Sequence, residues 1–294
     1  METTSSLTKR RGAFAGINGG FYERTGTYNG SSSGILKIHG KFFGIPQKPR
    51  GALGWTDKNN FFLIDQLIMK SELHLGESTY PIHALNRKRE DNQAVIYTWD
   101  FHRNTLTSPG GVELVFDKEG KFLAAASFNS ATAENGFVYS WGSNFSIPFE
   151  KPQHAKLSFD VDPLLDLEQK KNWNFFDNII GGTPVLVFAG KEITDFSSER
   201  TLEKFLKERF PRTAVGIKKS GTLIFLLAEG DNDNFKGLTI QELAFLMKSL
   251  DCEYAVHLDG GGSSTLCLQD KTIIGKRNSE ERPIANALLF FAEN

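Results

Sequence analysis

Short apolar segments separated by polar turn residues run along most of the chain. They are rich in β-branched and aromatic side chains, which favours strands over helices. Early in the chain the clearest of these segments are residues 35–38, 51–55, 61–64 and 94–97. The pairs that predict hairpins are 111–116 with 122–128 and 212–217 with 222–227. This regular spacing indicates sheets built from hairpins and meanders.

A helical period is clearest at residues 238–250. Thr239 and Glu242 have the spacing of a capping box at its start. The apolar residues that form one helical stripe there are Ile240, Leu243, Ala244, Met247 and Leu250. We expect two further helices, over about 5–11 and over about 199–210, and Pro211 would end the second one.

Several predicted strands end on glycine and polar residues. The most distinctive end follows the apolar segment 254–258, where Asp259 precedes three glycines and two serines. If the strand geometry persists, His257 and Asp259 project to the same side, and the glycines let the backbone approach a ligand closely. Polar or glycine residues also come after the predicted strands at 13–17 and 222–227, and they interrupt the predicted strand at 179–187. A tight turn is the alternative interpretation of each.

The composition is that of an ordinary globular chain. With 294 residues, of which 39% are hydrophobic and 23% charged, it can bury a substantial core as one elaborate domain or two small ones. No repeat or long low-complexity tract divides the chain. We therefore treat residues 1–294 as a single domain, with a possible subdomain of hairpins at about 77–176.

Charge and hydropathy exclude some classes of partner. The net charge of −1 gives no electrostatic basis for binding nucleic acid or an anionic membrane. No apolar run approaches the roughly 18 residues of a membrane helix, and the N-terminal residues lack the apolar run of a signal peptide. We expect neither nucleic acid as a partner nor a membrane-spanning segment.

Six motifs in order resemble those of the phosphodiester glycosidase family. They are Ile17-Asn18-Gly19-Gly20-Phe21, Gly181-Gly182-Thr183-Pro184-Val185-Leu186-Val187, Pro211-Arg212-Thr213-Ala214-Val215-Gly216, Gly237-Leu238-Thr239, Leu258-Asp259-Gly260-Gly261-Gly262-Ser263-Ser264 and Arg282-Pro283-Ile284-Ala285-Asn286-Ala287. Each motif alone is weak, but their order is specific, and the resemblance extends from about residue 13 to 290. It implies an α+β fold, a strand-rich layered arrangement of mixed, convoluted β-sheets with a few packed helices.

The resemblance also implies an activity. Members hydrolyse a sugar-1-phosphodiester. For this chain the resemblance implies an N-acetylglucosamine-1-phosphodiester as the substrate, either a small molecule or one linked to a polymer. It also implies that the protein is exported. The chain departs from the family pattern at His257, where Asn is expected, at Glu229, where relatives usually have Asp, and at Asp231, where many bacterial members have Arg.

Cleavage of a glycosyl–phosphate bond predicts roles for particular residues. Carboxylates must flank the bond, and we expect Asp259 and Glu229 to be the catalytic pair. A guanidinium can grip two phosphate oxygens, and we expect Arg212 first and Arg282 second to do so. The further residues predicted to bind substrate are Asn18, Gly19, Gly20, Gly182, Thr183, His257, Gly260, Gly261, Gly262, Ser263, Ser264 and Asn286. We expect no cofactor and no metal, since residues 231–233 lack the full calcium-loop pattern.

Two other functions remain open. The glycine-serine run 260–264 resembles a phosphate-binding loop of a sugar kinase, but the residues after it are extended in pattern and no Walker sequence occurs. A non-catalytic carbohydrate- or sugar-phosphate-binding envelope protein is the alternative from a different class. Thermal stabilisation of the protein by ATP would indicate the kinase. Tight binding of a sugar phosphate without formation of product would indicate the binding protein.

Overall fold

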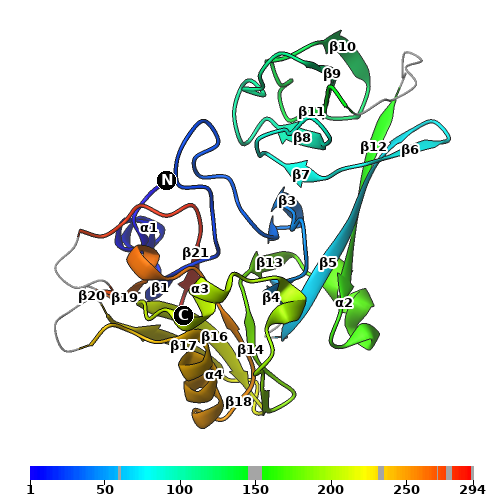
Figure 1. Cartoon of the computed structure of the whole chain (residues 1–294). Helices are drawn as coiled ribbons and strands as arrows, with labels where there is room; N and C mark the ends of the chain where they lie inside the picture. The colour runs from blue at the N-terminus through cyan, green and yellow to red at the C-terminus, as the bar shows by residue number, and fades with distance from the viewer. Residues whose placement is uncertain (59–60, 145–153, 231–234, 270, 276–279, 293–294) are drawn as a thin grey trace.

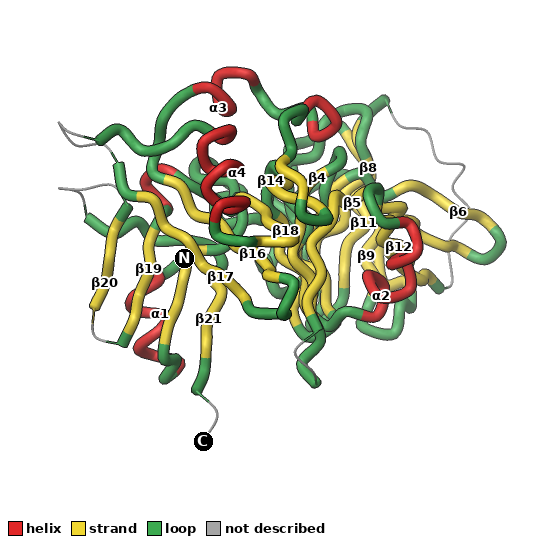
Figure 2. The backbone as a smooth tube through the Cα atoms, turned by 90° about the horizontal axis from the view of Figure 1, so that it is seen from below, coloured by secondary structure: helices red, strands yellow, loops and turns green. Residues whose placement is uncertain are grey.

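The computed structural model describes residues 1–58, 61–144, 154–230, 235–269, 271–275 and 280–292. Its strands form four sheets and its helices are few and short, so the expected α+β class is confirmed (Figures 1 and 2). Among the described helices, none has the length and apolar character needed to cross a membrane. Division into one domain with a hairpin subdomain at about 77–176 stays a prediction.

One five-stranded antiparallel sheet carries the most distinctive motif. Its order is β15 (Lys191–Glu192), β14 (Val185–Phe188), β18 (Cys252–His257), β16 (Arg212–Lys218) and β17 (Leu223–Ala228). Helix α4 (Ile240–Ser249) packs on β14 and β18 (Figure 1). The predicted capping box of Thr239 and Glu242 is present, and the predicted stripe residues Ile240, Leu243, Ala244 and Met247 are fully buried.

A four-stranded sheet joins segments from both ends of the chain. Its order is β20 (Lys271–Ile274), β19 (Thr265–Leu268), β1 (Ala15–Asn18) and β21 (Ala287–Phe290). Helix α1 (Thr4–Arg11) packs on β1 and β19. The contact requires glycine at position 16, since a Cβ there would lie 2.1 Å from Thr8 Oγ1. The polar ends of β1 and β18 meet, because the Asp259 N–H donates to Gly19 O at 3.0 Å.

The two remaining sheets are formed by strands that lie between residues 36 and 181. The larger has the order β12 (Ala155–Pro163), β5 (Phe62–Leu75), β4 (Arg50–Trp55), β13 (Asn178–Gly181), β2 (Leu36–Ile38) and β3 (Lys41–Gly44), with β6 (Ser78–Pro81) on β5 and helix α2 (Lys170–Phe175) against β12. The smaller has the order β10 (Phe122–Ala126), β9 (Gly111–Phe116), β11 (Phe137–Gly142), β8 (Ala94–Thr98) and β7 (Ala84–Leu85). Figure 1 shows this smaller sheet at the top, away from the motif-bearing strands.

The helix predicted over about 199–210 is shorter than expected. A 3₁₀ turn, Ser197–Glu199, is followed by Arg200 at φ 49°, and α3 covers only Glu203–Lys207. The buried Glu199 carboxylate accepts hydrogen bonds from the N–H groups of Gly51 and Val185, which fixes this turn. Tertiary contacts therefore override the local helical pattern.

Candidate functional site

Asn18 joins three strand ends at the centre of the site. Its Nδ2 donates to the backbone carbonyl of Asp259 at 2.7 Å. Its Oδ1 accepts from Thr213 Oγ1 at 2.8 Å and from the Thr265 N–H at 3.1 Å. Because the side chain is fully buried and these bonds all go to protein, Asn18 positions the loop that carries Asp259.

A cavity of about 900 Å³ opens beside this loop. The lining residues that the sequence predicted are Asp259, Gly260, Gly261, Gly262, Arg212 and Arg282. The lining residues that it missed are Phe21, Tyr22, Arg24, Phe205, Arg209, Phe210, Pro211 and Lys236. The structure thus brings the Asp-Gly-Gly-Gly motif, both predicted arginines and several loop side chains to one space.

The charge of the cavity is strongly positive. Five cationic side chains line it, from Arg24, Arg209, Arg212, Lys236 and Arg282, and Asp259 is the one acidic lining residue among those described. Arg209 is partly neutralised by an ion pair with Glu242, while Arg24 and Lys236 are exposed. Such a field attracts an anionic ligand.

Asp259 is half-buried and lines the cavity. The Gly260 N–H donates to its Oδ1 at 2.9 Å. Burial raises the pKa of the Asp259 carboxyl, while the Ser263 hydroxyl, the Gly260 N–H and the charge of Arg282 act in the opposite direction. A carboxyl with a raised pKa is suited to proton transfer.

Arg212 is held by backbone carbonyls and not by an ion pair. Its Nε donates to Leu238 O at 2.9 Å, and its Nη2 donates to Phe205 O at 2.9 Å and to Glu208 O at 2.8 Å. Among the described residues, Nη1 makes no hydrogen bond. Burial lowers the pKa of Arg212 to about 10, so the guanidinium stays charged at neutral pH and can offer Nη1 to an anion.

Arg282 lies directly against the glycine loop. A Cβ at position 262 would lie 2.3 Å from Arg282 Nη2, so a side chain there would displace the guanidinium from its place against the loop. Arg282 Nη1 lies 3.4 Å from the Ser263 hydroxyl, which is a long hydrogen bond. The guanidinium is therefore close to Asp259 and still has donors for a ligand.

His257 is fully buried beneath the loop. Its Nδ1 lies 2.7 Å from Thr183 O, a carbonyl that can only accept, so Nδ1 carries the proton. Burial, reinforced by the charge of Arg212, lowers the pKa of His257 to about 3. The imidazole is thus neutral, and Nε2 has no partner among the described residues.

The other predicted residues form the framework around the cavity. Asn286 Oδ1 accepts from the Gly20 N–H at 2.7 Å, and its backbone carbonyl accepts from Gly19 at 2.9 Å. Gly182 permits close strand packing, because a Cβ there would lie 2.2 Å from His257 O. The framework residues outside the described lining are Asn18, Gly19, Gly20, Gly182, Thr183, His257, Ser263, Ser264 and Asn286. Direct substrate contact by them stays a prediction.

Glu229 follows β17 at the end of the sheet where β18 also ends and Asp259 follows. β17 and β18 both pair with β16, so their ends are about 10 Å apart across that strand. Glu229 is half-buried and is not among the described lining residues. Its catalytic role stays a prediction, and Asp231 lies outside the described residues.

Two of the missed residues, Phe21 and Pro211, lie within recognised motifs, and others lie close to them in the chain. Tyr22 and Arg24 come just after Asn18–Phe21, and Lys236 comes just before Gly237. The Tyr22 hydroxyl donates to Pro283 O at 2.8 Å, which ties the first motif to the last. Within the described part of the chain, no three His, Cys, Asp or Glu side chains cluster so as to hold a metal ion.

Comparisons with known proteins indicate the family to which the chain is similar. A family model described as phosphodiester glycosidase matches residues 112–291. The mouse N-acetylglucosamine-1-phosphodiester alpha-N-acetylglucosaminidase is 38% identical over 68 residues, which are 23% of this chain and 13% of that protein. An uncharacterized prophage-derived protein of Bacillus subtilis is 32% identical over 83 residues, which are 28% of this chain and 13% of that protein. Both matches therefore span only a small part of these curated relatives.

A solved structure extends the similarity in fold to nearly the whole chain. A Burkholderia pseudomallei protein, described as a candidate exported protein, superposes with a TM-score of 0.77 at 19% identity. The superposition covers 99% of this chain and 68% of that one.

Proposed function

Because this chain belongs to the phosphodiester glycosidase family, we propose that it hydrolyses the glycosyl–phosphate bond of a sugar-1-phosphodiester. The observation that carries the proposal is the cavity in which five cationic side chains surround the carboxyl of Asp259. An N-acetylglucosamine-1-phosphodiester is the first substrate to test, because the mouse relative is named for that substrate.

The chemistry of the leaving group fits a cavity with one carboxylate. In an ordinary glycosidase, a second carboxylic acid protonates the glycosidic oxygen, which departs with the leaving group. Here the departing group is a phosphate monoester, whose second pKa is about 6. Near neutral pH it can therefore leave as the dianion, without a proton on the oxygen that was bonded to C1. A second acid is then less necessary, and the cavity can use cations in its place.

The proposed step assigns the remaining proton transfer to Asp259. The bond between sugar C1 and the phosphate oxygen breaks, and its electron pair stays on the phosphate. A water oxygen bonds to C1, and Asp259 accepts the proton that this water loses. Arg282, with Arg24 and Lys236 at the exposed side, stabilises the negative charge that grows on the departing phosphate.

An exported location is part of the proposal. It is supported by the resemblance described above and by the similarity in fold to the candidate exported protein of Burkholderia pseudomallei.

Hydrolysis in water enriched with oxygen-18 tests the position of bond cleavage. Cleavage between C1 and oxygen leaves the phosphate monoester free of the heavy isotope, because the water attacks carbon. Heavy isotope in the phosphate monoester, or release of a sugar 1-phosphate, would show attack at phosphorus and overturn the proposed step. Mass spectrometry of the phosphate product distinguishes these results.

A further inference from the structure

A second cavity, of about 700 Å³, lies on the other side of the segment that follows Phe21. Tyr22 and Arg24 line the first cavity, whereas Glu23 and Thr25 line the second. The segment is closed into a loop by hydrogen bonds of Glu23 N to Ser31 O at 2.9 Å and of Gly30 N to Glu23 O at 2.8 Å. The two cavities are therefore neighbours that share one wall.

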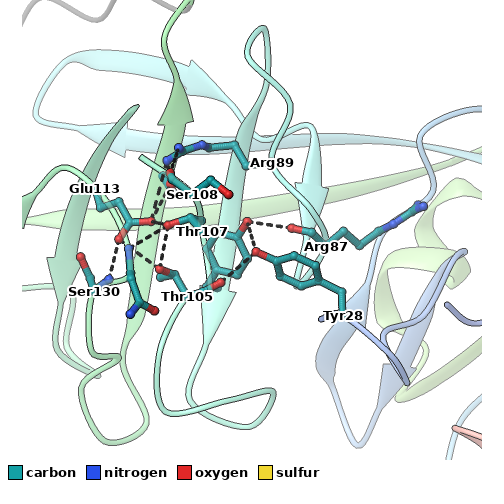
Figure 3. A network of polar contacts seen from close by, with 11 residues as sticks. Tyr28, Arg87, Arg89, Thr105, Thr107, Ser108, Glu113 and Ser130 are labelled. Atoms are coloured by element: carbon teal, nitrogen blue, oxygen red, sulfur yellow. Dashed lines mark hydrogen bonds and ion pairs between the residues drawn. The ribbon is translucent and has the colours of Figure 1, made fainter. Parts of the chain in front are cut away.

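Another part of the second cavity's lining, Arg89 and Thr107, is held by a buried carboxylate. Glu113, on β9, is fully buried and accepts from Thr107 Oγ1 at 2.7 Å and from Ser130 N at 2.8 Å (Figure 3). Arg89 Nη1 lies 3.8 Å from Glu113 Oε1, and Arg89 Nη2 donates to Ser108 O at 2.9 Å. Arg89 and Thr107 are therefore held in place before any ligand arrives.

Arg87 is arranged differently from Arg89. Figure 3 shows its side chain extending away from the Glu113 network, and its backbone carbonyl accepts from the Tyr97 hydroxyl at 2.7 Å. Among the described residues, its half-buried guanidinium makes no hydrogen bond or ion pair. Glu23 is the acidic residue whose charge acts on it. Arg87 thus offers unused donors at the cavity.

Two buried acceptor or donor atoms at the cavity also have no partner among the described residues. They are Ser31 Oγ, in a side chain that is 4% exposed, and Gln93 Oε1. Most buried polar atoms in folded proteins are hydrogen-bonded, and an unpaired one destabilises the fold. Gln93 Oε1 can only accept, so a partner must bring a donor such as a hydroxyl.

The charge balance of this cavity differs from that of the first. Its lining has three cationic and three acidic residues, Arg87, Lys88, Arg89, Glu23, Glu90 and Asp91. Lys88 pairs with Glu90 at 3.1 Å, and Arg89 faces Glu113. A balanced field of this kind does not favour an anion, whereas its donors and acceptors match a neutral ligand that is rich in hydroxyls.

We propose that the second cavity is a saccharide-binding site, separate from the cavity beside Asp259, which recognises the hydroxyls of an uncharged sugar unit through Arg87 and, once their buried polar atoms rotate toward the cavity, through Ser31 and Gln93. The binding test does not depend on the proposed hydrolysis, since binding is measured without turnover, and only the comparison of KM values rests on that hydrolysis.

Titration with N-acetylglucosamine, glucose and maltose, followed by calorimetry and ligand-observed NMR, tests the site. We expect at least one of them to bind, Arg87→Met to weaken binding about tenfold or more, and Ser31→Ala to weaken it about two- to tenfold. Lys156→Met, at an exposed position on β12, should leave binding unchanged, and so should Asp259→Asn. Absence of binding by all three sugars, or loss of binding in Asp259→Asn alone, would overturn the proposal.

The stability of the Ser31→Ala variant gives a second readout. Removal of an unpaired buried hydroxyl should leave the melting temperature unchanged or raise it, although ligand binding becomes weaker. A lowered melting temperature would show that Ser31 Oγ serves the fold and would contradict its role as a ligand group. Glucose 1-phosphate is the charged comparison, and tighter binding of it than of glucose at the second cavity would overturn the choice of a neutral ligand.

Two sources of the sugar unit can be separated by kinetics. If the unit is a remote part of the substrate, Ser31→Ala raises KM for a phosphodiester whose far side carries a sugar, and leaves KM for a short phosphodiester unchanged. If the unit is a separate saccharide, neither KM changes although binding is weakened. Either result supports the site and identifies the source.

Discussion

Asn18 and Asp259 are 241 positions apart, and the Asn18 amide donates a 2.7 Å hydrogen bond to the Asp259 backbone carbonyl. The same side chain accepts from Thr213 and Thr265. One buried amide therefore fixes the end of β1, the edge of β16 and both sides of the glycine loop. The carboxyl that we propose as catalytic takes its position from this junction.

Replacement of Asn18 by Ala should destabilise the protein and reduce turnover. Three buried partners lose their hydrogen bonds, so we expect the free energy of unfolding to fall by about 3 kcal/mol. Turnover should fall more than substrate affinity, because Asp259 is displaced. Urea unfolding and steady-state kinetics check this, with the exposed Asn29→Ala as the control. A variant as stable as the control would contradict the role of the junction.

Arg212→Lys should be destabilising although the charge is kept. A guanidinium reaches three backbone carbonyls at once, at 2.8 to 2.9 Å, and a lysine ammonium cannot reproduce that fork. We expect a loss of about 2–4 kcal/mol in urea unfolding. Arg10 is exposed and pairs with Glu2 at the surface, so the control variant Arg10→Lys should leave the midpoint of urea unfolding nearly unchanged. Equal effects at the two positions would show that the fork is unimportant.

Local signals in the sequence predicted much of the fold. The capping box and stripe of α4 and the hairpin of β16 and β17 each depend on residues close together in the chain, and each is confirmed. The helix at about 199–210 was predicted by the same kind of signal and is shorter. Its boundaries depend on Glu199 and on carbonyls that Arg212 binds, and these are contacts that no local window contains.

The site was predictable only where residues belong to recognisable motifs. Asp259, Arg212 and Arg282 belong to such motifs and line one cavity, and their roles in binding and catalysis stay predictions. Arg24 and Lys236 are exposed loop residues, and their types and spacing give no signal that they converge. The framework role of Asn18 could not be predicted either, since an asparagine at a strand end fits a ligand contact as well as a structural one.

Arg282→Gln tests the contribution of the cations. If this guanidinium stabilises charge on the departing phosphate, kcat/KM should fall by about 10- to 100-fold with little change in stability. Lys271→Gln, at an exposed position on β20, is a matched loss of charge that should have no such effect. A fall of less than about twofold for Arg282→Gln would remove it from the proposed mechanism.

The dependence of kcat/KM on pH tests the protonation state of Asp259. The pKa of this carboxyl is raised above its usual value of 3.8, mainly by burial. As a base it must be ionised, so activity should fall as pH decreases through the raised pKa, and the inflection should lie above 3.8. The Glu229→Gln variant should keep this acidic limb if Asp259 is responsible. A rate that rises as pH falls through this range would indicate an acid in place of a base.

The most direct test of the proposed function is release of free sugar from an N-acetylglucosamine-1-phosphodiester by the wild type and by Asp259→Asn. The variant should be folded and at least as stable as the wild type at neutral pH, because burial disfavours the ionised carboxylate that it removes. We predict release by the wild type and a loss of at least about 10³-fold in the variant. Near-normal release by a folded Asp259→Asn protein, or none by the wild type with this and other sugar-1-phosphodiesters, would contradict the proposal.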